Sequence, residues 1–302
     1  MNSMVENRYR VILQLTACLL MVFFFSCSKE ENRPVEDDIE NPVEEEKLPD
    51  TLKIISYNIL EGMKNDRANN YNKFVEWVKS HGPDVLALQE ANGFNQRQLE
   101  QLASRWGHKY VITNLKSTDN FPVALTSKYP LESRRRITLY TSHGAIFARL
   151  KNTEINIVTT HLWPQAYWKA VGDGRGDEYR LQEVNINLDS TIRKFPNEKY
   201  WLYMGDFNSV NRKDYEPNTT NQSFVVLDEV ENAGYTDVIH HLHGYKLNGT
   251  ANYDFRYPTR RIDFIFGSEA ILPKVVKAMP IYDEFTEVYS DHPPMMVQIL
   301  NK

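Results

Sequence analysis

The chain has 302 residues, enough for one large domain or two small ones. Its formal net charge is −5, from 35 Lys and Arg residues against 40 Asp and Glu residues, so the strongly basic surface of a general nucleic-acid-binding protein is absent. Its two cysteines, Cys18 and Cys27, both precede the globular part, which excludes disulfides and zinc–thiolate sites there.

The first 27 residues have the pattern of an export signal. Arg8 and Arg10 precede an apolar run over residues 11–25, and Cys27 follows it closely. The run is too short to span a bilayer comfortably. The pattern resembles a bacterial lipoprotein signal, in which Cys27 would become the lipidated first residue. This implies a protein of the cell envelope, held by its lipid on the outer membrane or the cell surface. An ordinary signal peptide that ends near a cysteine is the alternative.

Residues 28–50 are predicted to form an acidic, disordered tether. The segment contains three prolines and ten acidic groups but few apolar residues, so it cannot bury enough surface to fold. Residues 1–50 hold eleven of the 40 acidic side chains and five of the 35 basic ones. The remaining domain, residues 51–302, is therefore near neutral.

Strand-like and helix-like segments alternate from residue 51 onward, with no repeat and no obvious linker. Apolar spacing predicts strands over 52–59 and 84–90 and helices over 70–82 and 95–107. Five strands are expected next, over 108–113, 121–127, 135–140, 144–150 and 155–163. A helix over about 178–195, a buried strand that begins near 201, a helix over 224–232 and strands over 261–267 and 294–300 complete the series. This order predicts an α/β fold of two mixed sheets packed together, with helices outside.

Polar side chains collect at the ends of these strands. Those that end strands are Asn58, Glu90, His161, Asp206 and Asn208, and those that precede strands are Asp263, Asp291 and His292. In a mixed sheet, oppositely directed strands present opposite termini at one edge. We therefore expect these side chains to meet along one rim.

The residue types at this rim suit one kind of chemistry. Carboxylate and amide oxygens are hard ligands for Mg²⁺ or Mn²⁺, which can polarise a phosphoryl oxygen. A histidine paired with an aspartate can orient or deprotonate an attacking water. A further histidine and amides can donate hydrogen bonds to the phosphoryl oxygens. Together these groups indicate a metal-assisted phosphoester hydrolase.

Six short motifs at these positions resemble a known superfamily. They are SYNIL, VLALQE, TTHLW, GDFNS, RIDFIF and SDHPP, and they occur in the order and spacing of the endonuclease/exonuclease/phosphatase superfamily. The resemblance covers essentially all of residues 51–302. It implies a four-layered α/β sandwich like that of DNase I, two packed mixed β-sheets flanked by helices.

The resemblance also implies the metal site. Glu90 would be the principal carboxylate for Mg²⁺ or Mn²⁺, Asn58 would lie beside it, and Asp291 would be a further metal contact. Leu60 stands where apurinic endonucleases have an acid two residues after the asparagine, which argues against that subgroup.

The catalytic roles follow in the same way. The resemblance implies that His292 is the general base, polarised by Asp263. His161 would bind and stabilise the phosphoryl group, and Asp206 and Asn208 would position the attacking water and the phosphate. The substrate stays open between nucleic acid, a phospholipid head group and a small phosphate ester. A monomer is expected. A non-catalytic cell-surface binding module on the same fold is the alternative function.

Two further segments have competing interpretations. Residues 163–180 are rich in aromatic side chains, among them Trp163, Tyr167 and Trp168, and form either a substrate-contacting loop or an insertion that covers its own underside. The histidines at 240, 241 and 243 are predicted to lie in a solvated loop rather than a metal site, because no carboxylate or cysteine pattern accompanies them.

Overall fold

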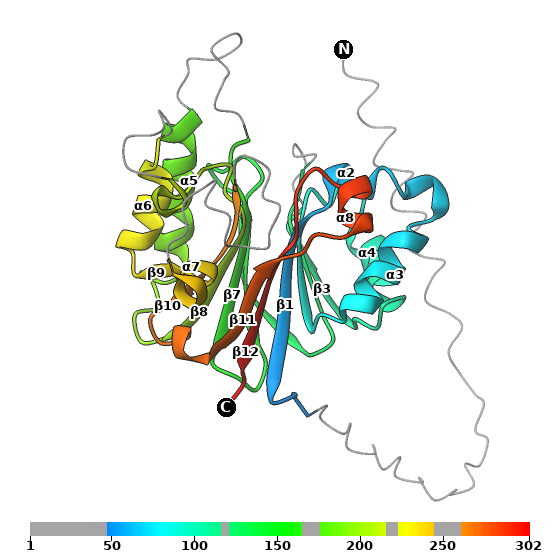
Figure 1. The fold of residues 1–302 in the computed structure, drawn as a ribbon, viewed down its shortest axis with the longest axis horizontal. Helices are drawn as coiled ribbons and strands as arrows, with labels where there is room; N and C mark the ends of the chain where they lie inside the picture. Colours follow the sequence, from blue (N-terminus) through cyan, green and yellow to red (C-terminus); the bar gives the residue numbers. More distant parts are fainter. Residues whose placement is uncertain (1–46, 116–120, 165–175, 216–222, 245–260) are drawn as a thin grey trace, which may run out of the picture. The chain divides into compact units, whose positions relative to one another are not determined.

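The computed structural model describes residues 47–115, 121–164, 176–215, 223–244 and 261–302. Within these residues the chain forms two six-stranded sheets (Figure 1). The strands of the first sheet, in spatial order, are β11 (Val275–Pro280), β12 (Met295–Leu300), β1 (Thr51–Asn58), β2 (Val85–Gln89), β4 (Ala124–Ser127) and β3 (Tyr110–Thr113). Those of the second are β5 (Leu131–Ile137), β6 (Ala145–Leu150), β7 (Ile155–His161), β8 (Tyr200–Asp206), β10 (Asp263–Ser268) and β9 (Tyr235–Asp237).

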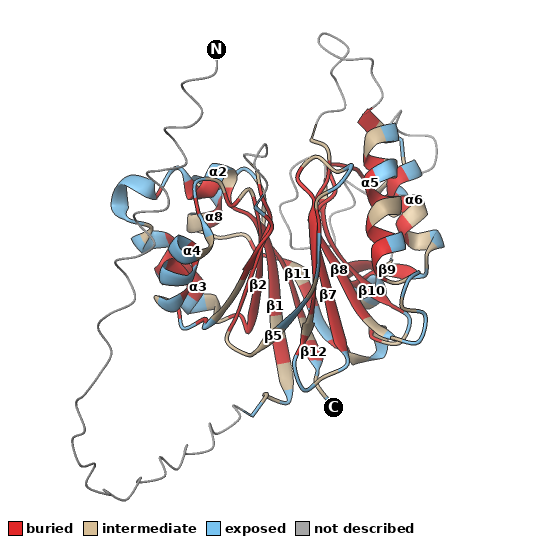
Figure 2. Ribbon diagram, turned by 180° about the vertical axis from the view of Figure 1, so that it is seen from behind, coloured by how far each residue is buried: buried red, intermediate tan, exposed pale blue. Residues whose placement is uncertain are grey.

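The two sheets pack face to face because their central strands are apolar on both sides. Ile54 of β1 and Ile157 of β7 belong to one hydrophobic cluster that contains residues of both sheets. The next residue of β1, Ile55, points to the opposite face and packs with Phe74 of a covering helix. Figure 2 shows the inner strands as almost continuously buried. Burial on both faces explains why these strands are unbroken apolar runs.

Helices cover the outer faces of the sheets. The helices are α2 (Leu60–Met63), α3 (Asn72–His81), α4 (Gln96–Ser104), α5 (Gly176–Ser190), α6 (Val225–Asn232), α7 (Val238–His243) and α8 (Glu284–Tyr289). Helices α3, α4 and α8 lie against the first sheet, and α5 and α6 against the second (Figure 1). No helix in the described part of the chain is long and apolar enough to cross a membrane. The four-layered sandwich is confirmed.

Several boundaries differ from the sequence prediction. The strand expected over 135–140 is β5, which begins at Leu131 and ends at Ile137, and Leu139 and Tyr140 beyond it are exposed. Helix α5 ends at Ser190 instead of continuing to 195. Five of these short helices and strands were not predicted, α2, β9, α7, β11 and α8, because three to six residues are too few to show a period.

Strand register brings the polar strand ends to one edge. Strands β7 and β8 are parallel, with His161 opposite Asp206. Strand β10 runs antiparallel to β8, so its first residue, Asp263, lies opposite Asp206. In the first sheet β1 and β2 are parallel, with Asn58 opposite Gln89. The edge predicted from sequence therefore exists, and it runs across both sheets.

Candidate active site

An imidazole–carboxylate pair lies at the centre of this edge. The Nδ1 atom of His292 is 2.7 Å from Oδ2 of Asp263 and 3.8 Å from Oδ2 of Asp206. An ionised carboxylate can only accept, so Nδ1 carries the proton of this hydrogen bond. Nε2 is then left on the opposite side of the ring, 3.9 Å from Oδ1 of Asp291. A neutral His292 in this tautomer can accept a proton at Nε2.

The turn that carries His292 is tied to the first sheet. It lies between α8 and β12, and its Ser290 Oγ donates to the carbonyl of Asn58 at 2.7 Å. The backbone N–H of His292 in turn donates to Ser290 Oγ at 3.2 Å. These hydrogen bonds place His292, which precedes β12 of the first sheet, next to Asp263 of the second sheet.

A second group of polar side chains joins the two sheets directly. The amide Nδ2 of Asn58 donates to Oε1 of Glu90 at 3.2 Å and to Oδ2 of Asp206 at 3.1 Å. The other oxygen of Glu90 accepts from the backbone N–H of Glu61 at 2.7 Å, and Oδ1 of Asn58 accepts from the N–H of Leu60. Asn58 thus forms a hydrogen bond with one carboxylate from each sheet, Glu90 in the first and Asp206 in the second.

The backbone around Glu90 is held in the left-handed region. Leu60, Glu61 and Met63 in the turn α2 have φ values of 46°, 49° and 55°, and Glu90 itself has a φ of 56°. Such conformations cost about 1–3 kcal/mol each in non-glycine residues and persist only where the surroundings enforce them. Gly62 within the turn can have no side chain, because a Cβ there would lie 2.0 Å from the carbonyl oxygen of Asn92. The strained turn directs the Glu61 N–H at Glu90.

Three further groups lie at the ends of β7 and β8. Asp206 is buried, and its Oδ1 accepts from the N–H of Asn208 at 2.8 Å. Asn208, with φ 47°, donates from Nδ2 to the carbonyl of Leu162 at 3.1 Å. The Nε2 atom of His161 lies 3.6 Å from Oδ2 of Asp206. All eight residues predicted from sequence therefore lie along one rim, seven of them in direct contact and Asp291 at the exposed margin.

The site carries a surplus of negative charge. Burial raises the pKa of Glu90 above its usual value. Burial also raises the pKa of Asp263, and the charge of Asp206 adds to this effect. Burial alone would lower the pKa of His292, but the carboxylates of Asp263 and Asp206 outweigh it and raise that pKa. A cation bound among these acids would relieve their mutual repulsion.

The side chains of the rim could bind a divalent cation, but the three whose ligand atoms lie closest together are not the residues predicted as metal contacts. In the described part of the chain, ligand atoms of Asp206, Asp263 and His292 lie within 4.8 Å of one another. Glu90 lies beside them through Asn58, whereas the Asp291 side chain is 67% exposed. Carboxylate oxygens at this density suit Mg²⁺ or Mn²⁺.

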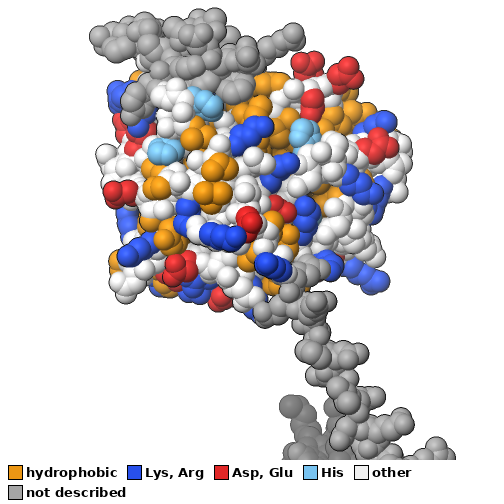
Figure 3. All heavy atoms as spheres, turned by 60° about the horizontal axis from the view of Figure 1, so that its bottom comes forward, with side chains coloured by type: hydrophobic (Ala, Val, Ile, Leu, Met, Phe, Trp, Pro, Cys, Tyr) orange, Lys and Arg blue, Asp and Glu red, His pale blue; other side chains and the backbone are white. Residues whose placement is uncertain are grey.

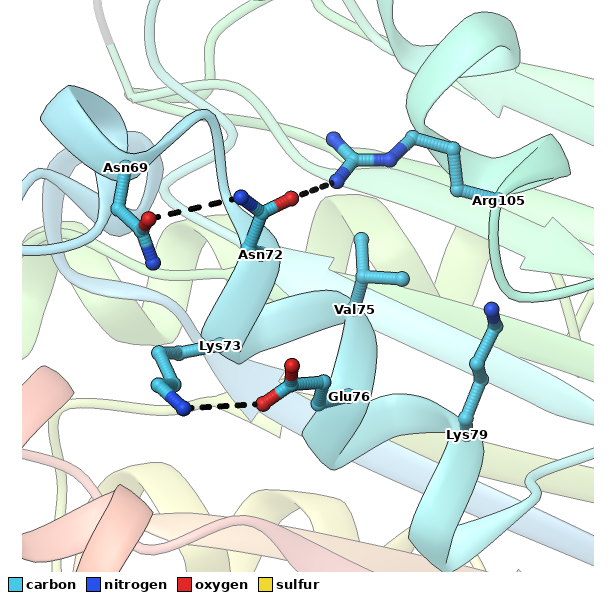
Figure 4. Close-up of a pocket in the computed structure, with 7 residues that line it drawn as sticks. All are labelled: Asn69, Asn72, Lys73, Val75, Glu76, Lys79 and Arg105. Carbon is cyan, nitrogen blue, oxygen red and sulfur yellow. Dashed lines mark hydrogen bonds and ion pairs between the residues drawn. The ribbon is translucent and has the colours of Figure 1, made fainter.

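A small hollow opens beside His292. It has a volume of about 270 Å³, and its lining includes Thr286 and Glu287 of α8 as well as Pro293. A larger hollow of about 550 Å³ lies over α3, where Lys73 pairs with Glu76 and Asn72 accepts from Arg105 (Figure 4). None of the residues that line it belongs to the rim, so the hollow next to His292 is the one that belongs to the site.

One member of the site was missed in the sequence, and one prediction was wrong. The ring of His143 lies against that of His161, with centroids 4.4 Å apart. His143 stands alone before a glycine and offers no pattern in sequence. His240 is not in a solvated loop, because it is buried in α7, 2.8 Å from Asp214. Of the segment 163–180, residues 165–175, with Tyr167 and Trp168, lie outside the described residues.

Comparison with known proteins decides the family. The model of the Endonuclease/Exonuclease/phosphatase family matches residues 55–292. The chain belongs to this family. Family membership makes it a hydrolase of phosphoester bonds. A search of curated proteins by sequence found no match.

Several solved structures have the same fold. An AP endonuclease from Archaeoglobus fulgidus is 20% identical, with a TM-score of 0.63, over 83% of this chain and 100% of that one. The 3'-5' exonuclease NExo from Neisseria meningitidis is 17% identical, with a TM-score of 0.61, over 82% and 99%. A humanized TDP2 of D. rerio is 18% identical, with a TM-score of 0.54, over 83% and 99%. At these identities the likeness shows the fold alone.

Proposed function

We propose that this family member is a Mg²⁺- or Mn²⁺-dependent phosphoester hydrolase in which His292, polarised by Asp263, activates the attacking water. The 2.7 Å contact between Nδ1 of His292 and Oδ2 of Asp263 carries this proposal. It leaves Nε2 of the imidazole available for a proton of water. The carboxylate of Asp263 fixes the tautomer and stabilises the imidazolium that forms.

The remaining side chains would bind the phosphoryl group and the water. His161 and Asn208 lie on the same rim and can donate hydrogen bonds to its non-bridging oxygens, where negative charge grows in the transition state. Asp206 lies between the two histidines, 3.6 Å from His161 Nε2 and 3.8 Å from His292 Nδ1. It can therefore orient the water that His292 deprotonates.

Glu90 would hold the cation, with Asn58 beside it and Asp291 as an outer contact. The bound cation would polarise a phosphoryl oxygen and offset charge on the leaving oxygen. The clustering of carboxylates supports this part of the proposal, because burial raises the pKa of Glu90 and a bound cation would favour its ionised form.

The rival function is a non-catalytic binding module. Such a protein need not retain the acid–imidazole pair or the half-buried Glu90, both of which place ionisable groups in a costly environment. Here Glu90 and Asp263 are kept in hydrogen-bonded positions at the rim. We therefore favour the enzyme.

The substrate class is not selected by the fold. Among the structural neighbours, a 3' phosphatase NExo from Neisseria is bound to a product DNA hairpin, at 16% identity and a TM-score of 0.60. For this chain we propose a phosphoester of nucleic acid, of a phospholipid head group or of a small molecule. Turnover of a diester, a monoester, DNA and sphingomyelin by the purified protein with Mg²⁺ would separate these.

The metal requirement is tested by the same assays. We expect EDTA to abolish turnover, Mg²⁺ or Mn²⁺ to restore it, and Glu90→Gln to lose most of the response to metal. Glu61→Gln is the matched control, since Glu61 is a neighbouring but exposed carboxylate paired with Lys64. Full activity in chelator would refute the metal-dependent mechanism.

A further inference from the structure

Helix α5 has a buried polar stripe that the proposed chemistry does not use. Arg180, Glu183 and Asn187 follow one another at spacings of three and four residues, so they lie on one face of the helix. Their exposed fractions are 2%, 4% and 1%. Buried polar groups cost stability unless they are hydrogen-bonded, so such a stripe needs partners.

All three residues bind the segments that surround His161. Asn187 donates to Oγ1 of Thr160 at 3.1 Å, directly before His161. Arg180 donates to the carbonyl of Trp163 at 3.1 Å, two residues after it. The stripe therefore contacts the chain on both sides of this histidine.

Glu183 makes the contact that joins two segments. Its Oε2 accepts from the backbone N–H of Trp163 at 2.8 Å, and its Oε1 accepts from the N–H of Ser142 at 2.5 Å. Ser142 directly precedes His143, whose ring lies on that of His161. One buried carboxylate thus fixes the backbone next to both imidazoles.

The segment that carries His143 is fixed from its other side as well. Asn114 donates to the carbonyl of His143 at 3.2 Å, and Gly144 accepts from the N–H of His161 at 3.3 Å. Gly144 has φ 83°, and a Cβ there would lie 2.4 Å from Nδ2 of Asn114. Phe121 also meets the His143 ring edge-on, with centroids 5.3 Å apart. Each contact favours one placement of the His143 ring.

We propose that Glu183 is a positioning residue for His161, acting through the two backbone N–H groups it binds, and that the His143 ring supports the face of His161. This inference rests on the proposed function, in which His161 binds the substrate phosphate. Fixing the ring in advance removes the cost of orienting it when the phosphoryl group gains charge.

Glu183→Gln tests the role of the carboxylate. A carboxamide has one acceptor oxygen, so one of the two backbone N–H groups would face an NH₂ group instead. We expect kcat to fall by about 10- to 100-fold, as for other residues that orient a catalytic group through hydrogen bonds. The same substitution in a His161→Ala protein should cause no further loss, because the group that Glu183 positions is gone.

Asp84→Asn is the matched control. Asp84 is also a buried carboxylate that accepts a backbone N–H, from Lys53 at 2.8 Å, but it lies at the opposite end of the strands. We expect it to lower the Tm comparably with no effect on kcat. An equal fold-loss from Glu183→Gln with and without His161 would overturn the inference.

The His143 ring is tested separately. His143→Phe keeps an aromatic face against His161 and should retain kcat within a few-fold, whereas His143→Ala should lower it about 10-fold. Equal losses in the two variants would overturn the supporting role of the ring.

A readout without turnover separates this inference from the proposed function. In NMR spectra, the imidazole signals of His161 and His143 should shift in Glu183→Gln, whereas that of the distant, buried His108 should not. If the unaltered protein hydrolyses no phosphoester, the proposed function fails while these spectra still test the positioning. Unchanged His161 signals would overturn it.

Discussion

The hydrogen-bonded pair of His292 and Asp263 gives the most direct test of the proposed chemistry. Removing the base should lower turnover by about 10²- to 10⁴-fold, the usual contribution of a positioned general base. Asp263→Asn should cost less than His292→Ala, because the base remains but its tautomer and orientation are no longer fixed. Steady-state kinetics of the two variants with saturating metal measure both losses.

The double variant distinguishes one unit from two independent residues. It should be little slower than His292→Ala alone, since residues that act together are strongly non-additive. Ser290→Ala is a third variant for comparison, because it removes the hydroxyl that ties the turn to Asn58 but leaves His292 and Asp263 in place. Losses that multiply, or near-normal rates in His292→Ala, would mean that the SDHPP segment is only a turn.

A separate prediction concerns the effect of His108 on the stability of the fold at acid pH. It is buried, with Nε2 2.9 Å from the carbonyl of Pro83 and Nδ1 2.8 Å from Thr126 Oγ1. A carbonyl only accepts, so Nε2 carries the proton and Nδ1 accepts from the hydroxyl. Burial lowers the pKa of His108 from 6.5 to about 4.

The sign of the pH effect follows from that shift. Between pH 6.5 and 4 the unfolded chain takes up a proton that the folded chain does not, so the free energy of unfolding falls as the pH falls. The slope is at most about 1.4 kcal/mol per pH unit for one group. Urea unfolding of His108→Gln should show a flatter pH dependence in this range. His241→Gln, at an exposed position of α7, should leave the dependence unchanged; identical profiles for both variants would contradict the prediction.

The pairing of β7 with β8 is the element on which the site most depends. Gly205 has φ 139°, and a Cβ there would lie 1.9 Å from the carbonyl oxygen of Thr160. The next pair in the register is His161 with Asp206. Gly205→Ala should therefore separate the two strands where both residues emerge, with a loss of about 3 kcal/mol in unfolding free energy and nearly all activity.

Gly107→Ala is the control for backbone strain. Gly107 also has a positive φ, 91°, but a Cβ there would meet no atom within 4 Å. Its substitution should cost only about 1 kcal/mol of strain and leave kcat intact. If urea unfolding gave equal losses for the two variants, steric conflict between β7 and β8 would not be the cause.

The same elements show what sequence could predict. Strands β1, β2, β7 and β8 were found because burial on both faces makes them apolar throughout, and their polar ends then marked the rim. The role of α5 could not be found in this way, because a helix face of Arg180, Glu183 and Asn187 looks solvated in sequence. Only the three-dimensional structure shows that this face is buried against the backbone near His161.

At the scale of the whole folded unit, the site and the start of the domain lie at opposite ends. The rim occupies the C-terminal ends of β1 and β8, whereas Pro49, just before β1, accepts from Nδ2 of Asn301 at the other end. Lys and Arg side chains are spread over this second end (Figure 3). The point at which the preceding segment joins the folded unit is therefore remote from the rim.

Membrane attachment through Cys27 can be tested by substitution. We expect Cys27→Ala to move the protein from the membrane fraction to the soluble fraction, because it removes the acceptor for the lipid. Cys18→Ala is the matched control, since Cys18 lies within the apolar run over residues 11–25, and its substitution should leave fractionation unchanged. A Cys27→Ala protein that stayed with the membranes as fully as the parent would show that this cysteine is not the anchor.

The Cys27→Ala protein also tests whether the segment before β1 takes part in catalysis. Because the rim is remote from residue 49, loss of the lipid should leave the kcat on a small soluble diester unchanged. Turnover of a substrate embedded in vesicles should fall instead, since attachment would raise its local concentration around the enzyme. Comparing the two substrates for parent and variant measures both effects. A large drop in kcat on the soluble diester would mean that the lipidated segment contributes to the site, contrary to this expectation.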